Sequence, residues 1–242
     1  MRVMIVMPTY NEAENLPLMV SELFSLGIEG LELLIIDDNS PDGTGDLAEA
    51  LARERPGKIQ VIHRQGKLGL GTAYVTGFRH ALSVGADYVF EMDADFSHKP
   101  SYIPEMLEAA RDSDVVVGSR YIPGGGVDAN WSPWRRFLSW WGNSIYARLI
   151  LGLQVHDSTA GFKCFRRSAL ESLDLDRISS QGYAFQVEVA YACQRNGLRV
   201  KEIPIIFPDR IRGKSKMSAN IGLEAAWRVW EIKWRYSIGG GR

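Results

Sequence analysis

Residues 89–98 read Val-Phe-Glu-Met-Asp-Ala-Asp-Phe-Ser-His, and this stretch carries more information than any other in the chain. A short apolar run ends in two carboxylates, Asp93 and Asp95, and polar or turn-forming residues follow directly. The order is typical of a buried strand that ends at a ligand-binding edge, because open α/β sheets bind ligands outside the carboxyl ends of their strands. Acidic residues also cap the helix that follows a strand, so the pair alone leaves a capping or solvated-loop interpretation open.

Asp93 and Asp95 also have the chemistry of a site for a metal ion and a diphosphate. Mg²⁺ and Mn²⁺ prefer oxygen ligands, and proteins commonly hold them with one or two carboxylates while phosphate oxygens complete the shell. The spacing of the two acids therefore favours a metal-diphosphate site at the end of this strand.

Strands and helices alternate on both sides of this stretch. Apolar runs predict strands at 3–7, 31–36, 58–63, 88–92 and 115–118, and apolar residues at helical spacing predict helices at 11–24, 44–53, 71–84 and 102–111. Such alternation predicts an α/β fold with a mainly parallel, Rossmann-like sheet flanked by helices.

The rhythm changes after the three glycines at 124–126. The expected elements there are an amphipathic segment at about 131–151, a strand at 161–165, a helix at 183–195, a strand at 200–207, a basic loop at 209–216 and a helix at 218–235. The sequence has no internal repeat and no linker. We therefore expect one domain over residues 1–242, with an elaborated carboxyl-terminal third.

Composition limits the class of protein. The chain has 242 residues, 45% of them hydrophobic, and a net charge of −1, which does not favour a nucleic-acid-binding surface. Cys164 and Cys193 are the only cysteines, so we expect no disulfide framework and a reducing cytoplasm. Residues 1–8 are too short a run for a signal peptide, and no apolar run reaches the roughly eighteen residues of a membrane span.

Tryptophan is concentrated in two segments. Four of the seven tryptophans lie in 131–141 and the other three in 227–234, and arginine or lysine is interleaved with the rings in both. Aromatic rings and cations together suit a membrane headgroup interface. The alternative is a core helix with a basic, solvated face.

Four polar clusters follow the predicted strands, at 8–12, 37–43, 93–95 and 118–121. Because the carboxyl ends of parallel strands lie at one edge, these clusters are expected to converge there, with the cations of the 209–216 loop beside them. Carboxylates for a base, a ribose or a metal, together with cations for phosphate, suit a sugar nucleotide.

Other nucleotide-binding and catalytic patterns are missing. A dinucleotide-binding dehydrogenase needs a glycine fingerprint after its first strand, and residues 8–12 contain no glycine. Gly69-Leu70-Gly71 precedes a helix, but Tyr74 stands where the third glycine of the pattern belongs. The four histidines, at 63, 80, 98 and 156, do not have metal-ligand spacing, so we expect them at the surface or behind the site.

Six motifs in order resemble the dolichyl-phosphate (polyprenyl-phosphate) mannosyltransferases, which are inverting family-2 glycosyltransferases with a GT-A fold. The motifs are Pro-Thr-Tyr-Asn-Glu at 8–12, Asp-Asp-x-Ser-Pro-Asp-Gly-Thr at 37–44, Lys-Leu-Gly-Leu-Gly-Thr-Ala-Tyr at 67–74, Met-Asp-Ala-Asp-Phe-Ser-His at 92–98, Gly-Ser-Arg-Tyr at 118–121 and Asp-Arg-x-x-Gly-x-Ser-Lys at 209–216. The resemblance covers almost the whole chain. It implies transfer of mannose from GDP-mannose to a polyprenyl or dolichyl monophosphate, with Mg²⁺ or Mn²⁺ as cofactor.

The resemblance also implies roles for single residues. The guanine and ribose of the donor would be held by Pro8, Tyr10, Glu12, Ile36 and Asp38. The metal and the diphosphate would be held by Asp93, Ala94 and Asp95. Ser97 stands where some relatives have a glutamine metal ligand, so it is a further candidate ligand and donor contact.

Phosphate contacts are implied for Arg120, Arg210 and Lys216, and Arg135 matches an arginine that meets the acceptor phosphate. The catalytic residues implied are Asp95, Arg120 and Arg135. Other interpretations remain for several residues: Glu12 can favour the first turn of its helix, Asp42 can be a turn residue, and Glu188 can either line the sugar pocket or face a neighbouring cation.

The implied partners are GDP-mannose, a polyprenyl phosphate and a membrane surface, with a separate membrane-anchoring protein as a further option and no nucleic acid. We expect the chain to bind the cytoplasmic face of a membrane peripherally, through 131–151 and also 227–234. Two alternatives stay open: a polyprenyl-phosphate hexosyltransferase that uses another donor such as UDP-glucose, and a non-catalytic subunit that binds nucleotide or lipid phosphate.

Overall fold

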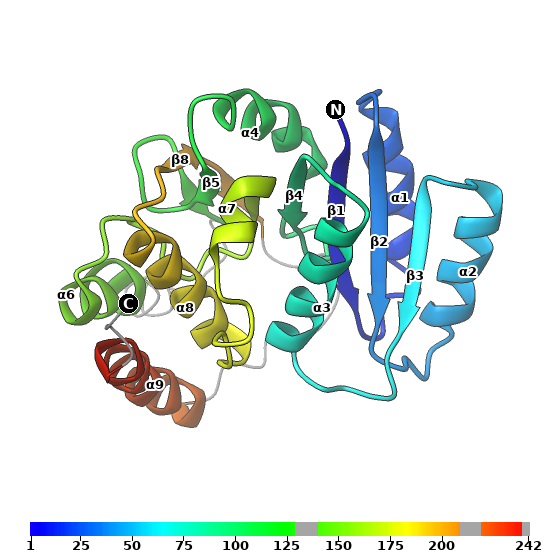
Figure 1. The fold of residues 1–242 in the computed structure, drawn as a ribbon. Coiled ribbons are helices and arrows are strands. Elements are labelled where there is room, and N and C mark those ends of the chain that lie inside the picture. Colours follow the sequence, from blue (N-terminus) through cyan, green and yellow to red (C-terminus); the bar gives the residue numbers. More distant parts are fainter. Residues whose placement is uncertain (129–139, 209–218, 239–242) are drawn as a thin grey trace.

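A seven-stranded sheet forms the centre of the protein in the computed structural model, which describes residues 1–128, 140–208 and 219–238 (Figure 1). Its strand order is β3-β2-β1-β4-β7-β5-β8. The bounds are β1 Val3–Thr9, β2 Leu31–Asp37, β3 Ile59–His63, β4 Tyr88–Glu91, β5 Val115–Ser119, β7 Lys163–Arg166 and β8 Val200–Pro204. All neighbours pair in parallel except β7, which is antiparallel to β4 and β5. The predicted mainly parallel sheet is therefore confirmed.

Helices cover both faces of this sheet. Their bounds are α1 Leu16–Ser25, α2 Thr44–Glu54, α3 Leu70–Ser83, η1 Pro100–Tyr102, α4 Ile103–Ala109, the π-helix η2 Trp141–Tyr146, α6 Ala147–Leu151, α7 Arg167–Ser172, α8 Gly182–Arg195 and α9 Ala219–Ile238. A second, two-stranded parallel sheet pairs β6 Gly126–Val127 with β9 Ile206–Phe207. Among the described helices, none combines the length and the apolar character that a membrane span requires.

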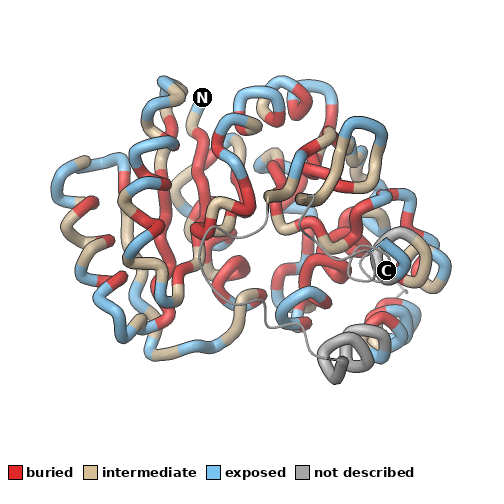
Figure 2. Tube along the Cα trace, turned by 180° about the vertical axis from the view of Figure 1, so that it is seen from behind, coloured by how far each residue is buried: buried red, intermediate tan, exposed pale blue. Residues whose placement is uncertain are grey.

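The alternation of side chains along β1 divides the core into two layers. Val3, Ile5 and Met7 are fully buried and pack with α1, α2 and α4 on one face. Met4 and Val6 point the other way and pack with α3, α7 and α8, which lie in front of the sheet in Figure 1. Successive strand residues face opposite sides, so a strand buried on both sides is apolar throughout. Buried positions accordingly run along the central strands, and exposed positions follow the outer helices (Figure 2).

Gly77 sets the distance between α3 and the sheet. A Cβ at this position would overlap Val6 and would come within 3.0 Å of Ile36 Cδ1. The missing side chain lets the helix axis approach β1 and β2 closely. This contact fixes where the first turns of α3 lie relative to the carboxyl ends of these strands.

The predicted helix over 11–24 begins later, at Leu16. Asn11 has a left-handed backbone with φ of 62°. The carbonyl oxygen of Glu12 then accepts hydrogen bonds from the amides of Asn15 and Leu16, which closes a turn. Pro17 occupies the first turn of the helix, where the missing N–H of proline has no intrahelical partner to lose. Residues 11–15 therefore form a loop at the edge of the sheet instead of a helix.

Other boundaries also differ from the predictions. The predicted strand over 200–207 divides into β8 and β9 at Ile205, which is buried and whose amide donates to Ser119 O. The short helix α7 was not predicted, because six residues are too few to show helical periodicity. Of the predicted amphipathic segment, 131–139 lie outside the described residues, as does the whole basic loop at 209–216.

Candidate active site

The carboxyl edge of the sheet brings the predicted polar clusters together. Thr9 at the end of β1 lies opposite Asp37 at the end of β2, and its hydroxyl donates to Asp37 Oδ1 at 3.1 Å. The amide of Glu12 donates to Thr44 Oγ1 at 2.9 Å, so the first cluster also contacts the residues after β2. The expected convergence of clusters from different strands is therefore confirmed for the first two strands.

Asp93 and Asp95 lie directly after β4 at this edge. The side chain of Asp93 is 33% exposed, and the phenol of Tyr74 donates to its Oδ1 at 2.9 Å. Asp95 is buried, with its Oδ1 accepting the amide of Ser97 at 3.1 Å. The residues at the N-terminal caps of η1 and α4 are Lys99 and Tyr102, and neither helix has a side-chain cap. The helix-capping interpretation of the two acids is therefore wrong.

The two carboxylates fit a divalent ion that is shared with a phosphate ligand. Both supply hard oxygen donors one residue apart at the carboxyl end of a strand. Within the described part of the chain, no group of three or more His, Cys, Asp and Glu could enclose a metal ion. Such a pair would supply only part of the shell, and Mg²⁺ is usually bound in this way, with substrate phosphates and water completing it.

Ser97 lies behind Asp95 and is 2% exposed. Its amide holds the Asp95 carboxylate, while the role of its hydroxyl as a metal ligand stays a prediction. Ala94 is also buried, side chain and main chain together, so it offers little surface to a ligand. The left-handed backbone of Phe96, with φ of 64°, turns the chain sharply between Asp95 and Ser97.

The histidine of this motif supports the backbone of Asp93. His98 is buried, stacks on Phe162 with ring centroids 5.1 Å apart, and accepts the Asp93 amide at Nδ1 over 3.0 Å. Burial lowers the pKa of His98 below its ordinary value, although Asp93 and Asp95 act in the opposite direction. We expected the histidines at the surface or behind the site, and His98 lies behind it.

The predicted nucleotide contacts lie around the ends of β1 and β2. Asp38 is buried, and its Oδ1 lies 3.1 Å from Arg64 Nη1 without an aligned hydrogen bond. Burial raises the pKa of Asp38, and the nearby Arg64 offsets part of that rise. Lys67 lies over the ring of Tyr10, 4.2 Å from its centroid. Asp38 and Tyr10 thus border one region, beside the loop that leads into α3.

The other predicted nucleotide contacts, Pro8, Ile36 and Glu12, are less accessible to a ligand or already have partners. Pro8 is half-buried and lies opposite Ile36 in the pairing of β1 with β2. Ile36 is fully buried in the core under α3, main chain included, so the structure exposes no part of it to a nucleotide. Glu12 accepts a hydrogen bond from Asn15 Nδ2 at 2.8 Å, just before α1.

Asp37 and Asp42 stabilise the loops around the site. Asp37 accepts the amide and the hydroxyl of Ser40 at 3.0 and 2.6 Å. Asp42 accepts the amide and the hydroxyl of Thr44 and also the amide of Ala13. Burial acts to raise the pKa of Asp42, but these hydrogen bonds outweigh it and hold the pKa below its ordinary value. The turn-residue interpretation of Asp42 agrees with these contacts.

Arg120 follows β5 and is held by an acid that sequence analysis did not identify. Its Nε and Nη2 donate to the two oxygens of Asp157, each at 2.7 Å, and Nη2 also donates to Thr159. The guanidinium lies 5.2 Å from the ring centroids of Tyr121 and Phe207. Burial opposes its charge, but Asp157 holds the pKa of Arg120 above its ordinary value. Arg120 is therefore a fixed, buried cation. Its charge helps to lower the pKa of His98, the residue that follows Asp93, Asp95 and Ser97 in the motif at 92–98.

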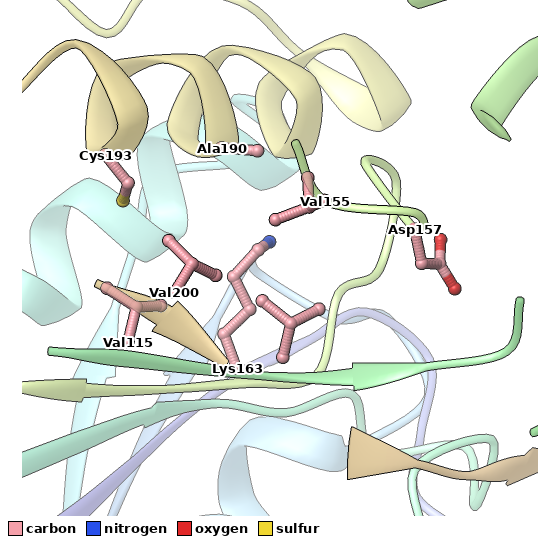
Figure 3. Close-up of a pocket in the computed structure, with 8 residues that line it drawn as sticks. Val115, Val155, Asp157, Lys163, Ala190, Cys193 and Val200 are labelled. Carbon is pink, nitrogen blue, oxygen red and sulfur yellow. The ribbon is translucent and has the colours of Figure 1, made fainter. Parts of the chain in front are cut away.

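A second buried ion pair lies below the acidic motif. Lys163 Nζ is 3.2 Å from Glu91 Oε2, and it also donates to Ala160 O and Gln186 Oε1. Burial raises the pKa of Glu91, and Lys163 limits that rise. Figure 3 shows Lys163 pointing into a cavity between α8 and the sheet. Its volume of about 10 Å³ is room for one water at most, so it is not a substrate pocket.

Glu188 on α8 faces a neighbouring cation, which is one of the two interpretations that the sequence left open for it. Its Oε1 accepts a hydrogen bond from Arg235 on α9 at 2.7 Å, and its Oε2 accepts the amides of Ser179 and Ser180. The side chain is completely buried. It therefore fixes α9 and the loop before α8, and these contacts support a structural role.

Three predicted site residues, Arg135, Arg210 and Lys216, lie outside the described residues. Sequence analysis also missed two residues that the structure places at the site. Tyr74 ends a recognised motif and lies in the predicted helix over 71–84, but nothing in its sequence position indicated a contact with Asp93. Asp157 begins a polar run, Asp-Ser-Thr, just before a strand, and this run was the signal that could have identified it.

Comparisons with known proteins agree with the resemblance. The family model described as "Glycosyl transferase family 2" matches residues 4–174. A protein of Micrococcus luteus named "Undecaprenyl-phosphate mannosyltransferase" is 47% identical over 238 residues, covering 98% of this chain and 96% of the relative. A protein of Mycolicibacterium smegmatis named "Polyprenol monophosphomannose synthase" is 44% identical over 237 residues, covering 97% and 88%.

Solved structures share the fold at low sequence identity. Glucosyl-3-phosphoglycerate synthase from Mycobacterium tuberculosis, in complex with Mn²⁺, UDP-glucose and phosphoglyceric acid, superposes with a TM-score of 0.67 at 18% identity. The match covers 98% of this chain and 80% of that one. The family model, the two near-full-length relatives, the sheet order and the acidic pair after β4 together show that the chain belongs to glycosyltransferase family 2 and has the GT-A fold.

Proposed function

We propose that the protein transfers mannose from GDP-mannose to a polyprenyl monophosphate, with inversion at the anomeric carbon. The main support is the identity of 44–47%, over nearly the full length, with relatives named for this type of acceptor and for mannose. The acidic pair at the carboxyl edge supports a donor that leaves as a diphosphate.

In this proposal Asp93 and Asp95 hold Mg²⁺ or Mn²⁺ together with the donor diphosphate, and Ser97 is a further candidate ligand. When bound, such an ion neutralises the charge that develops on the leaving diphosphate. The partial exposure of Asp93 and the burial of Asp95 suit this site. The carboxylate of Asp93 is reachable from solvent, while that of Asp95 is held by the turn that follows it. Ala94, between the two acids, would adjoin the diphosphate.

The donor nucleotide would lie between the ends of β1 and β2. Asp38 supports this position, because its buried Oδ1 accepts no aligned hydrogen bond and could accept one from a base N–H or a ribose hydroxyl. The ring of Tyr10 offers an apolar face beside it, with Lys67 as a neighbouring cation. Pro8 and Glu12 would complete this side.

The acceptor chemistry needs cations and no strong general base. The second pKa of a phosphate monoester is about 6, so the acceptor is mostly a dianion at neutral pH and is already a nucleophile. Arg120, fixed by Asp157, would orient it or the diphosphate. Arg135, Arg210 and Lys216 would supply further positive charge.

We further propose that the protein binds the cytoplasmic face of a membrane through its tryptophans. Trp227, Trp230 and Trp234 on α9 are 71%, 50% and 68% exposed, so these rings are not core residues. They recur at helical spacing, and the ammonium of Lys233 lies over the ring of Trp230. Aromatic rings beside cations suit a headgroup region, where the phosphate of the acceptor would lie while its isoprenoid tail enters the hydrocarbon core.

A transfer assay tests the proposal. Purified protein would be incubated with a polyprenyl phosphate, Mn²⁺ and radiolabelled GDP-mannose or UDP-glucose, and the label in the lipid fraction would be measured. We expect label from GDP-mannose only, with a β-linked product. Label from UDP-glucose alone would overturn the choice of donor, and transfer from neither donor would favour a non-catalytic subunit.

A further inference from the structure

We propose that Tyr74 is a positioning residue that holds the Asp93 carboxylate in the orientation needed for metal-diphosphate binding. The inference rests on the proposed function, because it assigns Asp93 to the metal. Its basis is one contact: the phenol of Tyr74, on the second turn of α3, donates to Asp93 Oδ1 at 2.9 Å. The two residues are 19 positions apart in the sequence and belong to different elements.

The ring of Tyr74 is held in place by the side chains packed around it. It is fully buried and lies almost parallel to Phe185, at 5.8 Å between centroids and 6° between planes, with Phe78 at 6.1 Å on α3. A Cβ at Gly71 would come within 2.5 Å of Ser180 O and 2.9 Å of Phe185 Cδ2, so only glycine lets α3 approach the start of α8 this closely. This packing fixes the ring, and the fixed ring determines where its hydroxyl lies.

The phenol of Tyr74 is the donor in its hydrogen bond with Asp93. A protonated phenol can donate to Oδ1 and leave lone pairs of the same carboxylate for a cation, because an ionised carboxylate has about four acceptor positions.

Asp93 is held from a second direction through its backbone. Its amide donates to Nδ1 of His98, which stacks on Phe162. With the main chain fixed by His98, the remaining freedom of Asp93 is rotation of its side chain, and the phenol of Tyr74 restrains that rotation. A carboxylate that is already oriented loses less conformational entropy when a ligand binds.

The alternative is that Tyr74 only satisfies its own buried hydroxyl and stabilises the core. The two roles differ in what they affect. A core role changes stability and any binding that depends on the fold, whereas a positioning role changes the part of nucleotide affinity that depends on the metal. Removing an outer partner of a metal ligand typically weakens metal binding by about 10- to 100-fold.

Isothermal titration of GDP, with and without Mn²⁺, separates these roles. Tyr74→Phe keeps the ring between Phe78 and Phe185 and deletes only the hydroxyl. Tyr191→Phe is the matched control, since Tyr191 is also buried and packs edge-on against Tyr236, on the side of α8 that faces α9. The measured quantity is the ratio of GDP dissociation constants without and with Mn²⁺.

For Tyr74→Phe we expect this ratio to fall by about tenfold or more, while GDP affinity without metal and the ratio for Tyr191→Phe stay at the wild-type values. An unchanged ratio in Tyr74→Phe would overturn the inference, whether GDP affinity stays at the wild-type value or falls equally with and without Mn²⁺. If the wild type itself shows no Mn²⁺-dependent gain, the proposed metal site fails instead. Should Tyr74→Phe not fold, a wild-type crystal with Mn²⁺ and GDP decides, and a phenol more than 3.5 Å from Asp93 would overturn the inference.

Discussion

At the scale of single residues, the acids of the carboxyl edge have different partners and therefore different roles. Asp37 and Asp42 accept backbone amides and hydroxyls and hold loops in place. Asp157 neutralises a buried arginine. Asp93 remains partly exposed at the edge where a ligand would bind. Residue type alone did not separate these roles, because each depends on which groups the carboxylate contacts: neighbours in the loop for Asp37 and Asp42, and an arginine 37 positions away for Asp157.

Replacement of Asp157 by asparagine is expected to destabilise the protein. Arg120 would then be a buried charge without a counter-charge, and breaking such a pair typically costs about 3–5 kcal/mol. For a chain of this size, each kcal/mol lowers Tm by about 2–4 °C, so we expect a fall of about 6 °C or more in Asp157→Asn. Glu171→Gln removes an exposed pair with Arg167 and should change Tm by about 2 °C or less. Equal effects of the two variants in a thermal unfolding experiment would contradict the assignment of Asp157.

At the scale of elements, much of the fold follows from apolar periodicity. The five predicted strands of the first 120 residues all exist, and their bounds differ from the observed ones by no more than two residues. The predicted start of α1 was wrong because the left-handed backbone of Asn11 belongs to the loop before the helix. Such a conformation leaves no periodic signal in the sequence. The antiparallel direction of β7 also could not be predicted, because a strand's direction is set by its neighbours and not by its own side chains.

The elements also explain which site residues were predicted. Residues at strand ends, such as Asp38, Asp93 and Arg120, could be placed at one edge from topology alone. Tyr74 and Asp157 could not, because each contributes through one partner, 19 and 37 positions away in the sequence.

Helix α9 has two apolar faces, and we expect them to respond differently to mutation. Val229, Ile232 and Tyr236 are buried against the rest of the molecule, while Trp227, Trp230 and Trp234 are exposed on the other face. Replacing the three tryptophans by alanine should weaken sedimentation with vesicles containing anionic lipid by at least about tenfold, because apolar burial in the interface is lost. The Tm should change little.

Ile232→Ala is the control on the buried face of α9. Deleting this core side chain should lower the free energy of unfolding by about 2–5 kcal/mol without changing vesicle binding of the folded protein. If the triple tryptophan variant binds vesicles as well as the wild type, α9 is not a membrane-binding surface.

At the scale of the whole molecule, the acid stability of the sheet depends on carboxylates away from the site. The side chain of Asp114 accepts hydrogen bonds from the amide and guanidinium of Arg199, at the amino edge of β5 and β8. The hydrogen bond from the Arg199 side chain is the main cause that lowers the pKa of Asp114 below 3.8. The unfolded chain therefore binds this proton at a higher pH than the folded protein does.

The stabilisation from Asp114 should thus be fully present above the unfolded pKa of 3.8 and be lost as the pH falls through the lower folded pKa. Asp114→Asn is expected to lower Tm at pH 7 by about 2 °C or less, because Arg199 is largely exposed. The difference between the variant and the wild type should shrink as the pH falls below 3.8. A difference that grows toward acid pH would contradict the role of this pair.

The proposed activity depends on Asp93 and Asp95 together binding a divalent ion and the donor diphosphate. The most direct measurement is a crystal structure with Mn²⁺ and GDP-mannose, in which the anomalous signal of manganese locates the ion. We expect one manganese ion coordinated by both carboxylates and by the diphosphate oxygens. An ion bound elsewhere, or a donor bound with both carboxylates turned away from it, would show that these acids are not the metal site.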